Sequence, residues 1–347
     1  MWKADKLIYN GDDSYVMAYQ GNELVWAKIT ESNVIYYTSS DGQIIEASTS
    51  SSTWGAEMVS NTYTDDGGVM IFDGPVTKVY MMNTTKLTSI TIPSAVEIID
   101  LRNNSVLTSV VINSPLIDRI NSYCFYDCVE LVSVVLPSTV TRIDESAFRN
   151  CYKLSSINWT NRLTLIGKSA FANCYELTIN NIPLSVTSLG DYAFSGCSKL
   201  STNLTIPSSI KTIGGGVFQD CSSLVNVIIR NGITLIDAYA FSGCSNLETI
   251  SIPESVTSLG QFAFQSCRKL VSITIPKSVK TIGRYCFSGY SGLEEAIVNA
   301  TVPPTLGVDA FTNNSGSLKY IKVPRASLNQ YKKASGWSDY ADKIVAQ

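Results

Sequence analysis

The sequence predicts a β-rich solenoid, a chain wound into successive coils of about 23 residues, and three periodic observations predict it. Phenylalanine recurs from Phe125 to Phe311 with gaps of 23 or 24 residues. Each of the first eight of these phenylalanines is followed by a leucine six residues later, as Phe241 is by Leu247. Seven of them are also followed by a cysteine three residues later, as Phe241 is by Cys244. Every coil therefore fills the same interior positions, because a coil buries its apolar face only against its neighbours.

This period, with leucines at fixed offsets, is typical of a leucine-rich-repeat solenoid with a parallel sheet on its concave side. The strands of about eleven coils are expected to begin near one leucine each. These are Leu87, Leu107, Leu131, Leu154, Leu177, Leu200, Leu224, Leu247, Leu270, Leu293 and Leu318.

Residues 247–260, LETISIPESVTSLG, illustrate a single coil. Apolar and polar residues alternate up to Pro253, which cannot continue a hydrogen-bonded ladder. We expect a short strand whose inward side chains are Leu247, Ile250 and Ile252. A turn and a second short extended segment should follow, and then a compact turn that carries the phenylalanine inward.

The nine cysteines are expected to be buried free thiols instead of a disulfide framework. Their number is odd, and seven of them share one position of the repeat. Side chains at one position of stacked coils project in parallel, so they lack the geometry of a disulfide. Cys124 and Cys286 stand where most other coils have alanine, and we expect them to fill that position as slightly larger residues.

Both ends of the chain differ from the middle, which predicts three parts: an N-terminal β unit and cap (1–75), the repeat array (76–324) and a C-terminal helical cap (325–347). The NGDD stretch at 10–13 predicts a hairpin between two aromatic-rich runs. The serine-rich residues 48–53 predict a loop. A helical pattern is expected at the C-terminus through Leu328, Tyr331, Ala334, Trp337, Tyr340 and Ile344.

Composition excludes several classes of protein. The net charge is −3 and only 16% of residues are charged, so there is no basic field for nucleic acid. Apolar runs stay short of the roughly 18 residues of a membrane span. The first residues carry charges at Lys3, Asp5 and Lys6 and lack the pattern of a signal peptide, which leaves a cytoplasmic or virion-associated location open.

The residues predict no catalytic site, metal site or cofactor. Histidine is absent, which removes the commonest general base and metal ligand, and no Cys-x-x-Cys motif occurs. The paired carboxylates Asp12-Asp13 and Asp65-Asp66 each adjoin glycine and are expected to be turn residues. The run Gly214 to Gly216 occupies a repeat position and lacks the lysine of a phosphate-binding loop. We therefore expect the chain not to be an enzyme.

The repeats LETISIPESVTSLGQFAFQSC (247–267) and LVSITIPKSVKTIGRYCFSGY (270–290) resemble the BspA-like leucine-rich repeats of bacterial surface proteins, also called the Treponema pallidum type. The resemblance covers residues 76–324 and extends to the ending after Leu318. It implies a non-enzymatic, adhesin-like scaffold at the cell surface or outside the cell, of a kind common in Bacteroidetes. Its partner would be a protein or glycan on a host or neighbouring cell.

Residues between the inward positions of each strand should form the exposed face of the sheet. Most are hydroxyl or small apolar residues, whereas charges gather in the later coils. The candidate binding surface is Glu248, Thr249, Ser251, Glu294, Glu295, Lys319, Tyr320 and Lys322. An alternative is a phage or prophage virion appendage, anchored by the N-terminal unit, whose array contacts the bacterial host.

Overall fold

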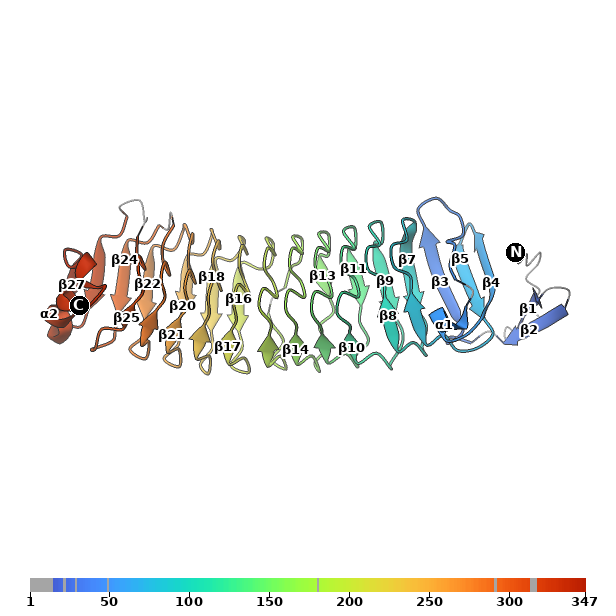
Figure 1. The fold of residues 1–347 in the computed structure, drawn as a ribbon, viewed down its shortest axis with the longest axis horizontal. Helices are drawn as coiled ribbons and strands as arrows, with labels where there is room; N and C mark the ends of the chain where they lie inside the picture. The colour runs from blue at the N-terminus through green and yellow to red at the C-terminus, as the bar shows by residue number, and fades with distance from the viewer. Residues whose placement is uncertain are drawn as a thin grey trace. The chain divides into compact units, whose positions relative to one another are not determined.

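The computed structural model describes residues 15–20, 23–28, 30–48, 50–179, 181–289, 292–312 and 317–347. The chain divides into two compact units, Met1–Arg162 (unit 1) and Leu163–Gln347 (unit 2). Each unit contains stacked coils whose strands form parallel sheets (Figure 1). The predicted β-solenoid of about eleven turns is therefore confirmed. The division of the sequence at residues 75 and 324 stays a prediction.

The main sheet of unit 1 has seven strands in the order β13-β11-β9-β7-β3-β5-β4. Its strands from β7 to β13 are parallel, whereas β3 runs antiparallel to both β7 and β5. The bounds are β3 Val34–Ser39, β4 Met58–Thr64, β5 Gly67–Phe72, β7 Leu87–Ile92, β9 Ser109–Ile112, β11 Ser133–Val135 and β13 Ser156–Ile157. Strand β1 Tyr15–Gln20 pairs antiparallel with β2 Glu23–Lys28. Two further pairings are parallel: β6 Lys78–Tyr80 with β8 Ile98–Asp100, and β10 Arg119–Ile120 with β12 Arg142–Ile143.

Two predicted features, the turn at 10–13 and the serine-rich loop at 48–53, lie near the beginning of the chain. The predicted hairpin turn at 10–13 and the pair Asp12-Asp13 lie outside the described residues. The loop prediction for residues 48–53 is wrong for 51–53, because Ser51–Trp54 form a short helix, α1. Ser50 caps it by accepting a hydrogen bond from the Ser52 amide, and Gly55 ends it with φ +87°. Burial of Trp54 against Phe72, with ring centroids 5.3 Å apart, stabilises this turn of helix.

Unit 2 has two sets of parallel strands, one on each side of the coil. The first set is β14 Leu165–Ile166 with β15 Ser188–Leu189, and the five-stranded sheet β17 Thr212–Ile213, β19 Leu235–Ile236, β21 Ser258–Leu259, β23 Thr281–Ile282 and β25 Thr305–Leu306. The second set is β16 Asn203–Ile206, β18 Asn226–Ile229 and β20 Thr249–Ser251, followed by β22 Ser272–Ile275, β24 Glu295–Val298, β26 Tyr320–Val323 and β27 Ile344–Ala346.

The second set of strands in unit 2 forms two sheets instead of one. Strand β20 ends the first sheet and β22 begins the second, and no ladder joins them in the described part of the chain. Leu247 is fully buried as predicted, but Ile250 and Ile252 are only half-buried. The corresponding Ile273 and Ile275 of the next coil are 2% and 0% exposed. Side chains therefore close less tightly over the interior beside β20.

The C-terminal helix is shorter than the sequence pattern predicts. It comprises η1 Arg325–Ser327 and α2 Leu328–Lys333, and after a further 3-10 turn, η2 Ser338–Tyr340, the chain ends in β27. Ile344 therefore lies on a strand that pairs with β26, not on a helix. The helix ends because Tyr331 Oη and Trp337 Nε1 donate hydrogen bonds to two carbonyls of an earlier coil, at 2.7 and 2.8 Å. On a straight helix side chains six residues apart point about 120° away from each other.

The phenylalanines of the repeat stack inside each unit. In unit 1 the rings of Phe125 and Phe148 lie 5.0 Å apart, and in unit 2 successive rings from Phe171 to Phe311 lie 5.2–5.9 Å apart. Trp337 and Tyr340 pack against Phe311 at the end of this stack. Their contacts cover the last phenylalanine, as an open stack requires.

All nine cysteines are free and buried, which confirms the expectation for the thiols. Six thiols of the repeated position each lie against a backbone carbonyl of the preceding coil. Sγ donates to that carbonyl at 3.1–3.2 Å in the pairs Cys128–Leu101, Cys151–Phe125, Cys197–Phe171, Cys221–Phe194, Cys244–Phe218 and Cys267–Phe241.

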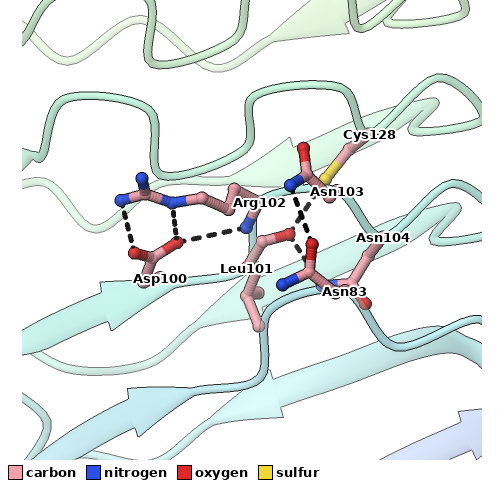
Figure 2. A network of polar contacts seen from close by, with 7 residues as sticks. All are labelled: Asn83, Asp100, Leu101, Arg102, Asn103, Asn104 and Cys128. Atoms are coloured by element: carbon pink, nitrogen blue, oxygen red, sulfur yellow. Dashed lines mark hydrogen bonds and ion pairs between the residues drawn. The ribbon is translucent and has the colours of Figure 1, made fainter.

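An early coil of unit 1 uses asparagine at the cysteine position (Figure 2). Asn104 is fully buried, and its Nδ2 donates to Met81 O at 2.6 Å and to Leu101 O at 2.7 Å. Its Oδ1 accepts from the Thr84 amide. On the surface nearby, Arg102 forms an ion pair with Asp100. These hydrogen bonds hold the backbone turns of neighbouring coils together, so we assign this network a structural role.

We predict that Leu247→Ala lowers the free energy of unfolding by about 2–5 kcal/mol, because it empties a fully buried position between two coils. The matched substitution Thr249→Ala should cost less than about 1.5 kcal/mol, since Thr249 is exposed and loses only its hydrogen bond to Asn226 Oδ1. Urea titration of both variants measures the difference. Equal losses would contradict the assignment of inward and outward residues.

We also predict that stability falls as the pH rises above about 8.5, the ordinary pKa of a cysteine in an unfolded chain. Burial raises the pKa of Cys128 and of Cys267 to about 12. Between these values the folded chain keeps a proton that the unfolded chain releases, so each such thiol removes up to about 1.4 kcal/mol per pH unit. Urea titrations at neutral pH and at about pH 9.5, under reducing conditions, test this. Cys267→Ala should weaken the dependence, and pH-independent stability would refute it.

Candidate functional site

The structure divides the eight predicted surface residues between two sheets of unit 2. Glu294, Glu295, Lys319, Tyr320 and Lys322, here called the C-terminal surface, lie on or directly before β24 and β26. Those two strands pair in parallel, with Glu295 opposite Tyr320. Glu248, Thr249 and Ser251 lie on or before β20, which belongs to the other sheet. Five of the predicted residues are therefore brought together, and three are not joined to them.

Charges on the C-terminal surface form two ion pairs between adjacent strands. Lys319 Nζ lies 2.7 Å from Glu294 Oε2, and Lys322 Nζ lies 2.5 Å from Glu295 Oε2. The hydrogen bond from Lys319 to the Glu294 carboxylate raises the pKa of the lysine. Exposed pairs of this kind add little to stability, but they hold long side chains in defined positions. The surface therefore carries two acids on the β24 side and two lysines on the β26 side, and these four charges sum to zero.

Tyr320 is the aromatic residue of the C-terminal surface. Its side chain is 49% exposed although its strand is paired on both sides. Glu295 and then Ser272 continue its row across the sheet. Val271, which directly precedes β22, is 50% exposed. An apolar ring fixed on a rigid strand between two ion pairs can contact a partner at a small cost in conformational entropy.

The three predicted residues near β20 form a different kind of surface. Thr249 Oγ1 donates to Asn226 Oδ1 at 2.6 Å, and Asn226 Nδ2 donates to Asn203 Oδ1 at 2.7 Å. These hydrogen bonds run from strand to strand across β16, β18 and β20. Thr249 therefore takes part in a row of side-chain hydrogen bonds with Asn226 and Asn203 on the exposed face.

Sequence reasoning missed Tyr36, which lies on β3 of unit 1 and is 54% exposed. Its neighbours Ile35 and Tyr37 are buried. VIYYTS begins with four apolar or aromatic residues in a row, so its pattern does not distinguish Tyr36 from Tyr37 as the outward aromatic. Its row crosses the sheet through Thr91, Val111 and Val135, and the last two are 38% and 49% exposed. Unit 1 thus presents a second surface with a prominent aromatic residue.

The residues that the structure describes include neither a membrane-spanning helix nor a cluster of metal ligands. None of the helices there is long and apolar enough to cross a membrane. Nor do three or more carboxylate or thiol side chains gather in a group suited to a metal ion within those same segments.

A family model described as a BspA type leucine rich repeat region, in six copies, matches residues 101–225 and 211–335. These matches together cover more than half of the chain. The chain belongs to the BspA-type leucine-rich-repeat family. The confirmed resemblance explains the fixed interior positions, since those residues define the repeat.

Several solved structures are similar to this BspA-type chain. A leucine-rich-repeat protein of T. pallidum is 27% identical, covering 65% of this chain and 91% of its own, with a TM-score of 0.43. One from Bacteroides ovatus is 20% identical, covering 99% and 100%, with a TM-score of 0.41. A leucine-rich cell surface protein of Faecalibacterium prausnitzii is 20% identical, covering 96% and 99%, with a TM-score of 0.40. A search of curated proteins found no match.

Proposed function

We propose that this chain is a non-enzymatic binding scaffold, displayed at the cell surface or outside the cell, that attaches to a protein or glycan on a host or neighbouring cell. Membership of the BspA-type family supports the proposal that the repeat array is the part of the molecule that carries the binding surface. The residues that define the repeat lie in the interior, so recognition falls to the exposed positions between them.

The observation that carries the proposal is the position of Tyr320. The ring is half exposed, and its strand lies between two others. The two lysines that flank Tyr320 in the sequence, Lys319 and Lys322, each form an ion pair, with Glu294 and Glu295 respectively. Tyrosine is enriched among the residues that dominate binding energy, and fixed charges around it select partners by complementary charge. A uniform face of serine and threonine offers neither feature.

We predict that Tyr320→Ala lowers affinity for a partner about tenfold or more, because an aromatic anchor is lost from a preorganised surface. Binding of the intact chain to an array of extracellular-matrix proteins and glycans would first identify a partner. Affinities of the variants would then be measured by surface plasmon resonance at low and high salt.

The double substitution Glu294→Lys and Lys319→Glu is a second variant for the same experiment. It keeps an ion pair and the net charge but reverses the local charge pattern, so the fold should be retained and the affinity reduced. Thr249→Ala serves as the control on the other sheet. Unchanged affinity in both Tyr320→Ala and the charge-reversed variant would refute the C-terminal surface as the binding site.

A further inference from the structure

We propose that the surface around Tyr36 is a second recognition site, and that it takes an arginine or lysine side chain of a protein partner. The site consists of Tyr36, the carboxylates Glu31 and Asp66, and the hydroxyl residues Thr38, Ser89 and Thr91. This inference builds on the proposed binding function, but it concerns a different surface and it chooses a basic protein over a glycan at that surface.

The ring of Tyr36 is held by a rigid support. Strand β3 is paired on both sides, with Tyr36 opposite Val69 of β5 and opposite Thr91 of β7. Behind it, Tyr37 is buried and its hydroxyl donates to Asn61 Oδ1 at 2.7 Å. The exposed ring therefore has a fixed base, and binding orders little additional backbone.

Hollows border Tyr36 on two parts of the sheet. One has a volume of about 730 Å³ and is lined by Thr30, Glu31, Val34, Tyr36, Thr91, Pro93 and Asn113. The other has a volume of about 220 Å³, and its lining includes Tyr36, Thr38, Asp66, Gly67, Gly68 and Ser89. The side chains around Tyr36 are mostly short, which leaves these hollows open. The ring of Tyr36 is therefore accessible to a partner.

The charge of the two hollows has a single sign. Each hollow is lined by one carboxylate, Glu31 in the first and Asp66 in the second. Lysine and arginine are both missing from the described residues that line them. Some exposed acids elsewhere in unit 1 have a basic partner, as Asp41 has in Lys86 at 2.6 Å. The Tyr36 site therefore attracts a cation and repels an anionic partner such as an acidic glycan.

A guanidinium or ammonium group satisfies all of these features together. It is attracted to the face of an aromatic ring and to a carboxylate at the same time. An arginine also supplies several N–H donors for hydroxyl oxygens such as that of Thr91. The hydroxyls of Thr38 and Ser89 already bond each other at 2.6 Å, so they contribute less to this contact. A neutral sugar could stack on the ring, but it would gain nothing from the uncompensated negative charge.

The experiment measures binding of the full chain to an immobilised peptide of Ser-Gly-Arg repeats, with Ser-Gly-Lys and Ser-Gly-Gln repeats for comparison. We expect binding to the first two peptides and not to the third, with an affinity that falls as salt rises. Tyr36→Ala should reduce affinity about 2- to 30-fold, whereas Tyr36→Phe should retain most of it. The pair Glu31→Gln and Asp66→Asn should also reduce it.

The matched control is Glu294→Gln with Glu295→Gln, which removes the same charge from the C-terminal surface. Equal losses in the two double variants would show attraction by net charge alone and would overturn the proposal. A second outcome would also overturn the proposal: a neutral glycan that binds the protein, no longer binds Tyr36→Ala, and still binds the double variant Glu31→Gln with Asp66→Asn. The site would then recognise a sugar instead of a basic side chain. Tyr320→Ala, measured in parallel on the matrix-protein array, reports the C-terminal surface separately, so that failure of either site is distinguishable.

Discussion

A hydrogen bond from an interior side chain to a carbonyl of the preceding coil recurs through both units. Phe218 O shows why it matters, because this buried carbonyl accepts from the Cys221 amide of its own coil at 3.2 Å and from Cys244 Sγ of the next coil at 3.2 Å. The amide alone already satisfies this carbonyl, so the thiol, a weak donor, adds a second hydrogen bond that joins the two coils. Asn104 makes the equivalent contact with a stronger amide donor. The thiol is thus small enough for the core and polar enough to hydrogen-bond to the preceding coil. Because this bond joins the same two positions in successive coils, the number of residues in a coil is nearly constant.

Because the interior is so constrained, the exposed positions are free to differ from coil to coil. Strands stacked about 4.8 Å apart present outward side chains in straight rows. The chain fills most of these rows with hydroxyl and small apolar residues and places an aromatic ring at Tyr36 in unit 1 and at Tyr320 in unit 2. Tyr320 is surrounded by compensated charges and Tyr36 by uncompensated carboxylates, so the two surfaces suit partners of different charge.

Much of the fold was predictable from sequence because the phenylalanine and cysteine positions repeat with their neighbours. The predictions failed where one contact overrides a local pattern. Trp54 finds a buried position and turns a serine-rich stretch into α1, and hydrogen bonds of Tyr331 and Trp337 end the C-terminal helix early. The missing ladder between β20 and β22 leaves no signal in a coil whose sequence looks regular. Ion pairing on the C-terminal surface depends on the register between strands, which the sequence alone does not state.

Infrared spectroscopy of the folded protein detects the thiol hydrogen bonds directly, because the S–H stretching frequency falls when a thiol donates a hydrogen bond. We expect a clear band, displaced to lower frequency than in the urea-unfolded chain, that weakens when Cys221, Cys244 and Cys267 are replaced by alanine. A band at the frequency of the unfolded chain would contradict the hydrogen-bonded ladder. Its absence from a non-reduced sample would show that the thiols are oxidised and would contradict the account as well.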